Sequence, residues 1–299
     1  MAKPSAGELM QALLDSMQDL TDATANVKTM IYGESGVGKT VLAMEMAQRL
    51  TPGDKRILFL DTYEGWVSLL NHPELKKRSA RMKYQGLSQI DLLVQAIQAD
   101  TPFADIGTVV VDEISSIAKK DLDNVLNTRA AKDPSKDRDV ATQPDMGANT
   151  ERMRRTFGDL LAMDINVILV SHIREDADAR TGVKTIRPGM MPKMSVTIRE
   201  QLHDVVHMTA DEIRDEEGNV GYTRSLQVLP TRGVVAKTRV GGLDIHTSTA
   251  DYIRAVGEWM RGDRESLDPE TIEVADDLES MVVTLELETD ENVVGVEID

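Results

Sequence analysis

The pattern of hydrophobic and polar residues predicts strands and helices that alternate through the first two thirds of the chain. Apolar runs of strand length, most of them ending in polar residues, lie at residues 29–32, 56–61, 107–111 and 165–172. Between them, apolar residues recur at helical spacing over residues 41–50 and 90–97. This alternation is typical of the α/β class, in which helices flank a mainly parallel sheet.

Beyond residue 200 the pattern changes to short strands that follow one another without helices between them. Residues 204–209, 223–229 and 233–238 are predicted to extend the sheet as antiparallel strands. Apolar residues at helical spacing over residues 253–260 predict a closing helix. The sequence therefore predicts a parallel core with an antiparallel C-terminal edge.

Two stretches are predicted to be irregular. Residues 128–150 are rich in Lys, Asp, Pro, Ala and Gly and nearly lack apolar side chains, so we expect a long mobile loop there. Residues 174–199 contain six basic residues interspersed with Gly and Pro, which predicts a second loop.

The two ends of the chain differ from the predicted core, which spans residues 27–262. Residues 1–26 are predicted to form an N-terminal helix and linker, because apolar residues recur there at helical spacing. This helix either covers its own domain or docks on a neighbouring subunit. Residues 263–299 are strongly acidic, and two alternatives remain for them, a small hairpin or a disordered tail.

The negative charge of the chain is concentrated at its C-terminal end. Of the net charge of −17, residues 263–299 carry −13, from 14 acidic residues and one basic residue, which leaves −4 for the rest. A nearly balanced core is compatible with a nucleic-acid partner. The absence of cysteine excludes disulfides and thiolate metal sites. Since no signal pattern and no membrane-spanning run is present, we expect a cytoplasmic protein with no membrane partner.

Residues 33–40 carry the most specific motif in the sequence. They match G-x-x-x-x-G-K-[ST] at each fixed position, after a strand-like run and before a helical one. The glycines let backbone N–H groups turn inward toward phosphates, while the Lys39 ammonium and the Thr40 hydroxyl suit the outer phosphates and Mg²⁺. We therefore predict that a nucleoside triphosphate and Mg²⁺ bind here. The predicted nucleotide-binding residues are Gly33, Glu34, Ser35, Gly36, Val37, Gly38, Lys39 and Thr40.

Polar residues at the ends of three further strands complete the predicted site. Asp112 closes an apolar strand and is the expected carboxylate on the magnesium ion, alongside Thr40. Glu64 and Glu113 are alternatives for the residue that activates water. His172 follows another strand, where it either senses the terminal phosphate or has no role in catalysis.

The order of these motifs resembles that of RecA-like ATPases. The matching segments are residues 33–40, 58–64, 109–112, 169–172 and 234–239. Residues 143–147 and 188–192 also fit the phage nucleotide-binding branch of that superfamily, which includes Sak-type single-strand-annealing recombination factors. The resemblance spans residues 27–260 and implies a RecA-like P-loop fold with ATP as the hydrolysed nucleotide.

The resemblance also implies roles for individual residues. It favours Glu64 over Glu113 as the water-activating acid, although Tyr63 interrupts the family's Asp-Thr-Glu pattern and Glu113 stands where Ser is usual. It further implies that Lys237 and Arg239 reach the triphosphate of a neighbouring subunit, which requires a homo-oligomer, either a ring or a filament. The alternative for these two residues is an edge strand with solvated charges.

By the same resemblance, the two predicted loops lie where RecA-like recombinases contact DNA. The basic residues of the second loop suit a phosphate backbone, although the loop lacks aromatic residues for base stacking. The predicted DNA contacts are Arg180, Lys184, Arg187 and Lys193.

The leading hypothesis for function is a phage-encoded ATPase that acts on single-stranded DNA in recombination or annealing, in the cytoplasm of the bacterial host. A single-strand-binding protein is an expected partner. Two alternatives remain: a replicative-helicase-like DNA motor, and a nucleotide-switched regulatory or assembly ATPase without a nucleic-acid role.

Overall fold

The computed structural model describes residues 25–263 except 100, 178–181, 191, 215–217 and 219, together with four isolated residues, 5, 7, 10 and 11. Apart from these four residues and residues 25, 26 and 263, the predicted N-terminal segment and the acidic tail lie outside the described residues, as do the side chains of residues 192 and 193. Within the part of the chain that is described, no helix combines the length and the apolar character needed to cross a bilayer.

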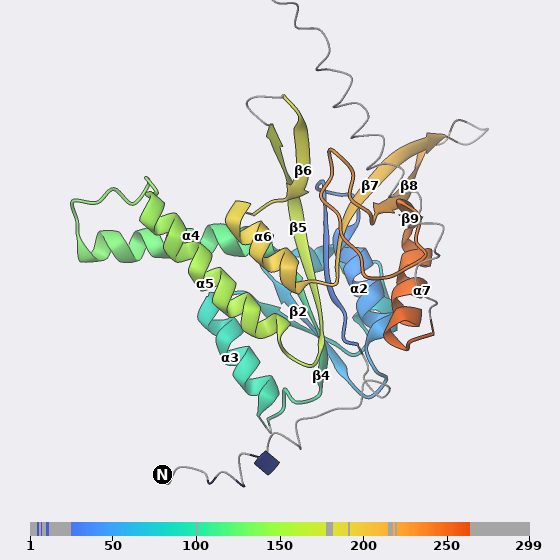
Figure 1. Ribbon diagram of the computed structural model, residues 1–299, viewed down its shortest axis with the longest axis horizontal. Coiled ribbons are helices and arrows are strands. Elements are labelled where there is room, and N and C mark those ends of the chain that lie inside the picture. Colours follow the sequence, from blue (N-terminus) through green and yellow to red (C-terminus); the bar gives the residue numbers. More distant parts are fainter. Residues whose placement is uncertain are drawn as a thin grey trace, which may run out of the picture.

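Strands and helices alternate along the described chain, as the hydrophobic pattern predicts (Figure 1). The strands are β1 (Lys28–Gly33), β2 (Arg56–Asp61), β3 (Ser79–Lys83), β4 (Ile106–Asp112), β5 (Asn166–Ala177), β6 (Lys184–Pro188), β7 (Asp204–Arg214), β8 (Val220–Gln227) and β9 (His246–Ser248). The helices are α2 (Lys39–Leu50), α3 (Leu87–Gln98), α4 (Ile114–Lys132), α5 (Gln143–Leu161), α6 (Pro192–Gln201) and α7 (Thr249–Met260), with the 3₁₀ turns η1 (Gly65–Leu69) and η2 (Pro73–Lys76).

One sheet organises the molecule, with its strands in the order β3-β2-β4-β5-β1-β7-β8-β9 and with β6 paired to β5. The six strands from β3 to β7 in this order are parallel, whereas β8 and β9 are antiparallel to their neighbours. The carboxyl ends of β1, β4 and β5 therefore meet at one edge, which is where ligands bind in open α/β sheets. The prediction of an α/β fold, with a mainly parallel sheet flanked by helices and with antiparallel C-terminal strands, is confirmed.

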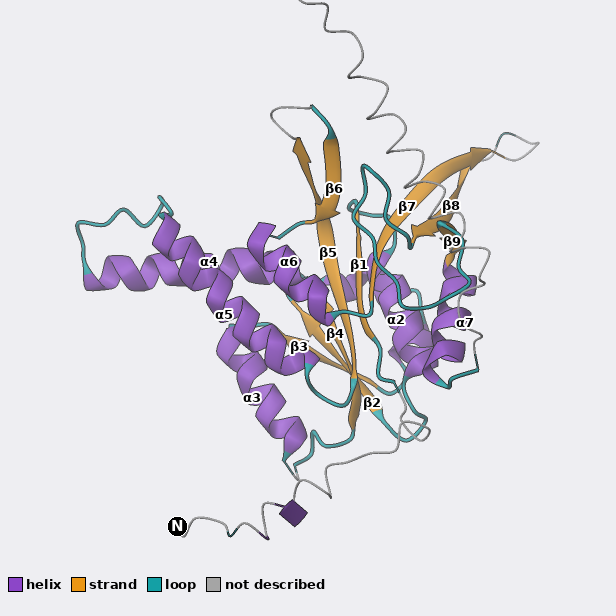
Figure 2. Cartoon of the chain, viewed as in Figure 1, coloured by secondary structure: helices purple, strands orange, loops and turns teal. Residues whose placement is uncertain are grey.

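Helices cover both faces of the sheet (Figure 2). On the face of α3, α4, α5 and α6, Tyr32 of β1 and Val109 of β4 share a buried cluster with Phe157 of α5. On the face of α2 and α7, Ile31 shares a second buried cluster with Leu42 of α2. Because neighbouring residues of one strand serve opposite faces, the strands read as continuous apolar runs in the sequence.

The predicted long loop over residues 128–150 is shorter than expected, because α4 and α5 extend into it from both sides and leave residues 133–142 as the irregular part. Thr142 and Asp145 form a capping box that starts α5. Deeper between the two helices, Asn149 is buried and donates to the carboxylate of Asp121, at 3.0 Å. The polar composition suggested a loop because these polar side chains satisfy one another between helices instead of facing solvent.

Residues 174–199 are also ordered where they are described, contrary to the second loop prediction. β5 continues past the sheet and pairs with β6 as a two-stranded antiparallel ribbon, and α6 follows (Figure 1). An ion pair between Arg187 and Asp176 joins the two strands. Charged residues on both strands conceal the alternation by which a strand is recognised. We call residues 173–177 and 184–188 the β5–β6 ribbon.

The predicted strand over residues 233–238 does not form. Lys237 meets Val205 in an isolated bridge, and the carbonyl of Val235 accepts a hydrogen bond from the hydroxyl of Tyr32, at 2.6 Å. The backbone of this segment is thus satisfied by separate contacts instead of a ladder. The strand β9 takes the position next to β8.

A buried carboxylate, Asp204, ties the C-terminal part of the chain to the first strand. It accepts hydrogen bonds from the hydroxyls of Thr29 in β1 and Tyr252 in α7, at 3.5 and 3.0 Å. The Thr238 hydroxyl and the Arg239 backbone N–H donate to its other oxygen, at 2.7 and 3.1 Å. Burial raises the pKa of Asp204, and these hydrogen bonds oppose the rise. A fully enclosed carboxyl group needs such a set of donors to be tolerated in the core.

Candidate nucleotide-binding site

Residues 33–40, called the phosphate loop from here on, connect β1 to α2 at the carboxyl edge of the sheet. Gly36 and Gly38 have φ angles of 83° and 104°, in the left-handed region that favours glycine. A Cβ atom on Gly33 would lie 2.4 Å from the carbonyl oxygen of Met208 in β7. These glycines let the loop curl tightly against the sheet, and the N-terminus of α2 faces the space that it encloses.

Lys39 begins α2 and bends back over the loop. Its Nζ donates to the carbonyl oxygens of Gly33 and Glu34, at 3.0 and 2.6 Å. Burial lowers the pKa of Lys39, and the nearby carboxylates of Glu113, Asp112 and Glu34 oppose this shift. The ammonium group is thus held at the centre of the loop, where a phosphate chain can take over its hydrogen bonds.

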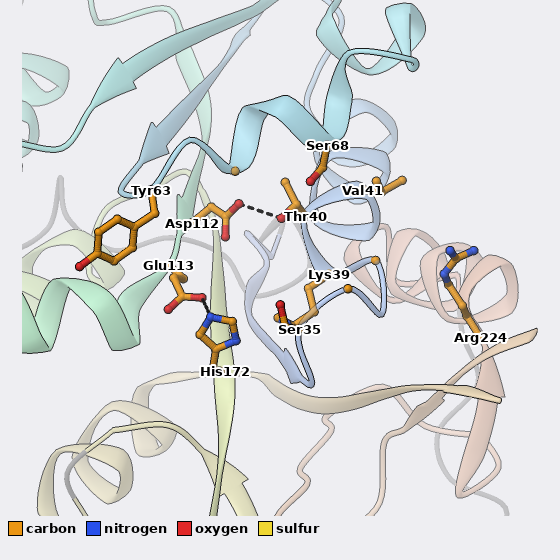
Figure 3. Close-up of a pocket in the computed structure, with 13 residues that line it drawn as sticks. Ser35, Lys39, Thr40, Val41, Tyr63, Ser68, Asp112, Glu113, His172 and Arg224 are labelled. Carbon is orange, nitrogen blue, oxygen red and sulfur yellow. Dashed lines mark hydrogen bonds and ion pairs between the residues drawn. The ribbon is translucent and has the colours of Figure 1, made fainter. Parts of the chain in front are cut away.

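Thr40 and Asp112 meet across the site from different elements. The Thr40 hydroxyl donates to a carboxylate oxygen of Asp112, at 2.8 Å (Figure 3). Burial raises the pKa of Asp112 to about 6, the hydrogen bond from Thr40 opposes the rise, and Glu113 and Asp61 add to it. The two oxygens fit Mg²⁺, which prefers hard oxygen ligands and takes its remaining ligands from water and phosphate.

A glycine that the sequence analysis did not single out makes room for this carboxylate. A Cβ atom on Gly65, the first residue of η1, would lie 2.2 Å from Oδ2 of Asp112. The buried carboxylate of Asp61 fixes the turn, since it accepts from the Gly65 N–H at 2.9 Å and from Arg81 at 2.6 Å. A glycine four residues after a strand-ending aspartate was the available signal.

Glu113 is held by three donors. One of its carboxylate oxygens accepts from the hydroxyls of Ser115 and Ser116, at 2.8 and 2.6 Å. The other lies 2.6 Å from Nε2 of His172, at the point where β5 leaves the sheet (Figure 3). The side chain of His172 is about half exposed, whereas Glu113 is nearly buried. Both predicted residues thus belong to one cluster beside Asp112.

Glu64 is placed differently. It is exposed, has a φ angle of 60°, and lies between Tyr63 and Gly65, which both line the cavity described next, while Glu64 itself does not. Of the two glutamates predicted as alternatives, Glu113 is therefore the one whose side chain faces the predicted magnesium ligands.

A cavity of about 400 Å³ brings most of the predicted site together. It is lined by the phosphate loop, by Tyr63 and residues of η1, by Asp112 and Glu113, by His172, and by Arg224 of β8. Arg224 was missed in the sequence, because no local motif connects it with a loop almost 190 residues earlier in the chain.

Lys237 and Arg239 lie near the amino ends of the parallel strands, whereas the phosphate loop lies at their carboxyl ends. Lys237 Nζ donates to the carbonyl oxygens of Arg199 and Leu202 at the end of α6, at 3.0 and 2.7 Å. The backbone of Arg239 contacts Asp204, at the start of β7, while its side chain is exposed. Neither residue reaches the phosphate loop of its own chain, and a contact with a second subunit stays a prediction.

The predicted DNA contacts are spread over the β5–β6 ribbon and its surroundings. Lys184 and Arg187 lie on β6, where Lys184 is exposed and 3.8 Å from Glu175. Arg180 and the side chain of Lys193 lie outside the described residues. The structure thus brings two of the four predicted residues onto one ribbon.

A family model described as an AAA domain matches residues 25–240. Among solved structures, the chain is similar to the flagellar accessory protein FlaH from Methanocaldococcus jannaschii, with 10% identity and a TM-score of 0.40, over 74% of this chain and 84% of that one. No curated protein sequence matches the chain. Because the family model covers most of its length, this chain belongs to the AAA-domain family and is a P-loop ATPase.

Proposed function

We propose that the protein binds ATP with Mg²⁺ in the cavity at the phosphate loop, hydrolyses it, and uses it to act on single-stranded DNA in recombination or annealing. The observation that carries the hydrolytic part is the meeting of Thr40, Asp112 and Glu113 in one cavity with Lys39. This set contains the phosphate-binding, metal-binding and water-activating groups that phosphoryl transfer to water requires.

Each group has a distinct role in this proposal. The backbone N–H groups of the phosphate loop and the Lys39 ammonium hold the phosphate chain and neutralise its charge. Thr40 and Asp112 would hold the Mg²⁺ ion, which supplies Lewis acidity at the phosphate oxygens when bound. Glu113 accepts the proton of the attacking water, and His172 positions the carboxylate of Glu113 from the opposite side.

The DNA part of the proposal is supported by the β5–β6 ribbon. β5 leads directly from His172 at the nucleotide cavity into the ribbon, which projects from the sheet and carries Lys184 and Arg187 (Figure 1). Carboxylates of the same ribbon neutralise part of this positive charge. A modest, salt-sensitive affinity for a phosphate backbone is expected from such a surface.

The proposal includes a homo-oligomer, a ring or a filament, in which Arg239 and Lys237 serve a neighbouring nucleotide. It is supported by the position of both residues far from their own phosphate loop. A single-strand-binding protein as partner, a phage origin and the bacterial cytoplasm as the place of action belong to the same proposal.

The proposal is tested by the rate of ATP hydrolysis with and without single-stranded DNA, for the wild type and for Lys39→Ala. We expect the rate of ATP hydrolysis to rise when single-stranded DNA is added. We expect Lys39→Ala to abolish hydrolysis under both conditions. Turnover that DNA does not change would instead indicate a regulatory or assembly ATPase, and unwinding of a forked duplex by the protein alone would indicate a helicase-like motor. Failure of the wild type to bind or hydrolyse ATP would overturn the hydrolytic part itself.

A further inference from the structure

Arg224 reaches the phosphate loop from a distant part of the chain. It lies on β8, where pairing with Ala210 of β7 fixes its backbone. Its Nε donates to the carbonyl oxygen of Val37, at 2.9 Å, and its side chain lines the same cavity as Lys39 and Thr40 (Figure 3). A strand of the sheet, and not a mobile loop, thus delivers a guanidinium group to the nucleotide cavity.

The phosphate loop is shaped to accept this side chain. A Cβ atom on Gly38 would lie 2.9 Å from Nε of Arg224, so a larger residue at this position would displace the guanidinium. Gly38 therefore serves two purposes, since its φ angle also needs glycine. The contact between loop and arginine is specific in its geometry, although the arginine is solvent-exposed.

Among the described residues, most of the N–H donors of the Arg224 guanidinium have no partner. The Val37 carbonyl is its one hydrogen-bond partner among the residues that the structure describes, and within the same residues Arg224 forms no ion pair with a carboxylate. An arginine has five N–H donors in a planar fork that matches phosphate oxygens. The two terminal nitrogens are thus available to an anionic ligand in the cavity.

Arg224 also borders a second, smaller cavity of about 190 Å³ next to the phosphate loop. This cavity is lined by Val41, Leu42 and Met208 and by the polar side chains of Glu45 and Thr249. Figure 3 places Arg224 on the side of the phosphate loop opposite Asp112, Glu113 and His172. The guanidinium therefore stands away from the groups proposed to face the terminal phosphate, on the side of the second cavity.

We propose that Arg224 binds the nucleotide held by its own chain, through the inner phosphates that ATP and ADP have in common. This proposal rests on the proposed nucleotide site, and it adds a second cation to Lys39. Because Arg224 does not contact the terminal phosphate, it strengthens substrate and product binding to the same extent. It is a binding residue and does not stabilise the transition state selectively.

The test measures the dissociation constants of ADP and ATP for the wild type, Arg224→Ala, Arg224→Lys and Arg214→Ala. Arg214 is the matched control, since it lies on the neighbouring strand β7, is exposed, and is bound to Glu212. Arg224→Ala loses one charge-assisted contact at an exposed site, so its affinity for ADP and for ATP is expected to fall about tenfold. Arg224→Lys should recover part of the affinity, and Arg214→Ala should bind like the wild type.

Salt dependence and Lys39→Ala separate the outcomes. The affinity of Arg224→Ala for ADP should fall less steeply with salt than that of the wild type, because one ionic contact is missing. Unchanged affinity of Arg224→Ala, while Lys39→Ala loses binding, would overturn the role of Arg224 and leave the nucleotide site intact. A loss confined to ATP would also overturn it, since it would place Arg224 at the terminal phosphate. If the wild type binds neither nucleotide, the proposed function fails as well.

Discussion

Two neighbouring carboxylates, Asp112 and Glu113, are placed in different surroundings. Asp112 is buried against η1 and the Thr40 hydroxyl, a setting that suits a cation. Glu113 is held by two hydroxyls and an imidazole. These three contacts together leave its carboxylate able to accept a further hydrogen bond. Adjacent residues of one strand end can thus divide the work of binding metal and activating water.

The assignment of the water-activating acid predicts a difference between two conservative variants. Glu113→Gln should lower the turnover of ATP about 100-fold or more, since it removes the proton acceptor but keeps the size of the side chain. Glu64→Gln, its control, should hydrolyse ATP like the wild type because Glu64 does not line the cavity. Turnover numbers at saturating ATP decide the matter, and the reverse ranking of the two variants would reassign the role to Glu64.

The raised pKa of Asp112 predicts how stability depends on pH. The pKa of Asp112 is about 6 in the folded protein, above its ordinary value in the unfolded chain. As the pH rises, the unfolded chain therefore loses this proton before the folded protein does, and the fold becomes less stable. Without nucleotide and metal, Asp112→Asn should therefore melt a few degrees higher than the wild type at pH 7.5. The gain should shrink as the pH falls below 6 and disappear near pH 3, where the carboxyl is largely protonated in both states. Melting temperatures that differ by the same amount at both pH values would contradict this origin.

At the scale of elements, the turn η1 shapes the site together with the phosphate loop. Its first residue leaves space for the Asp112 carboxylate, and Asp61 holds the turn in place. The β5–β6 ribbon plays a corresponding part on the other side of the cavity, because it begins where His172 meets Glu113.

Gly65→Ala is predicted to inactivate the site without unfolding the chain. The new methyl group would push Asp112 away from Thr40, and we expect ATP turnover to fall at least tenfold, since the expected magnesium ligands separate. Gly53→Ala is the control, because no atom lies within 4 Å of its Cβ position. Circular dichroism should be unchanged in both variants, and full activity of Gly65→Ala would rule out this role for the turn.

The ribbon predicts where single-stranded DNA binds. Lys184→Glu reverses an exposed charge on β6 and should weaken DNA binding at low salt several-fold, because a phosphate contact becomes a repulsion. Lys77→Glu makes the same change of charge at an exposed position between η2 and β3, away from the ribbon and outside both segments predicted to contact DNA. Equal losses in the two variants, measured by fluorescence anisotropy, would point to a non-specific effect of net charge.

Sequence reasoning succeeded where one local cause determines the structure. The buried strands and the phosphate loop are specified by short runs of residues, and both were predicted within a few positions. It failed for part of residues 128–150 and for residues 174–199, where polar residues satisfy partners on another element. Arg224 and Gly65 could not be predicted, because each gains its importance from a contact with a residue far away in the chain.

At the scale of the whole molecule, the position of Arg239 predicts a property of assemblies. If its guanidinium serves a neighbouring nucleotide, Arg239→Ala mixed with the wild type should lower ATP turnover by more than its share of the subunits. Arg239 suits this test better than Lys237, whose ammonium also binds the end of α6. Activity that falls in simple proportion to the mutant fraction would argue against a shared site.

The carboxylate of Asp204 has a consequence for the synthesis of the chain. The last of its donors, Tyr252, lies near the C-terminal end of the ATPase core, and the first, Thr29, lies at its beginning. During translation, residue 252 must therefore leave the ribosome before Asp204, beside β1, can gain its full set of hydrogen-bond donors. Until then, burying Asp204 would leave its carboxyl group without one of its donors. This cost favours late formation of the core around Asp204 over stepwise folding from the N-terminus.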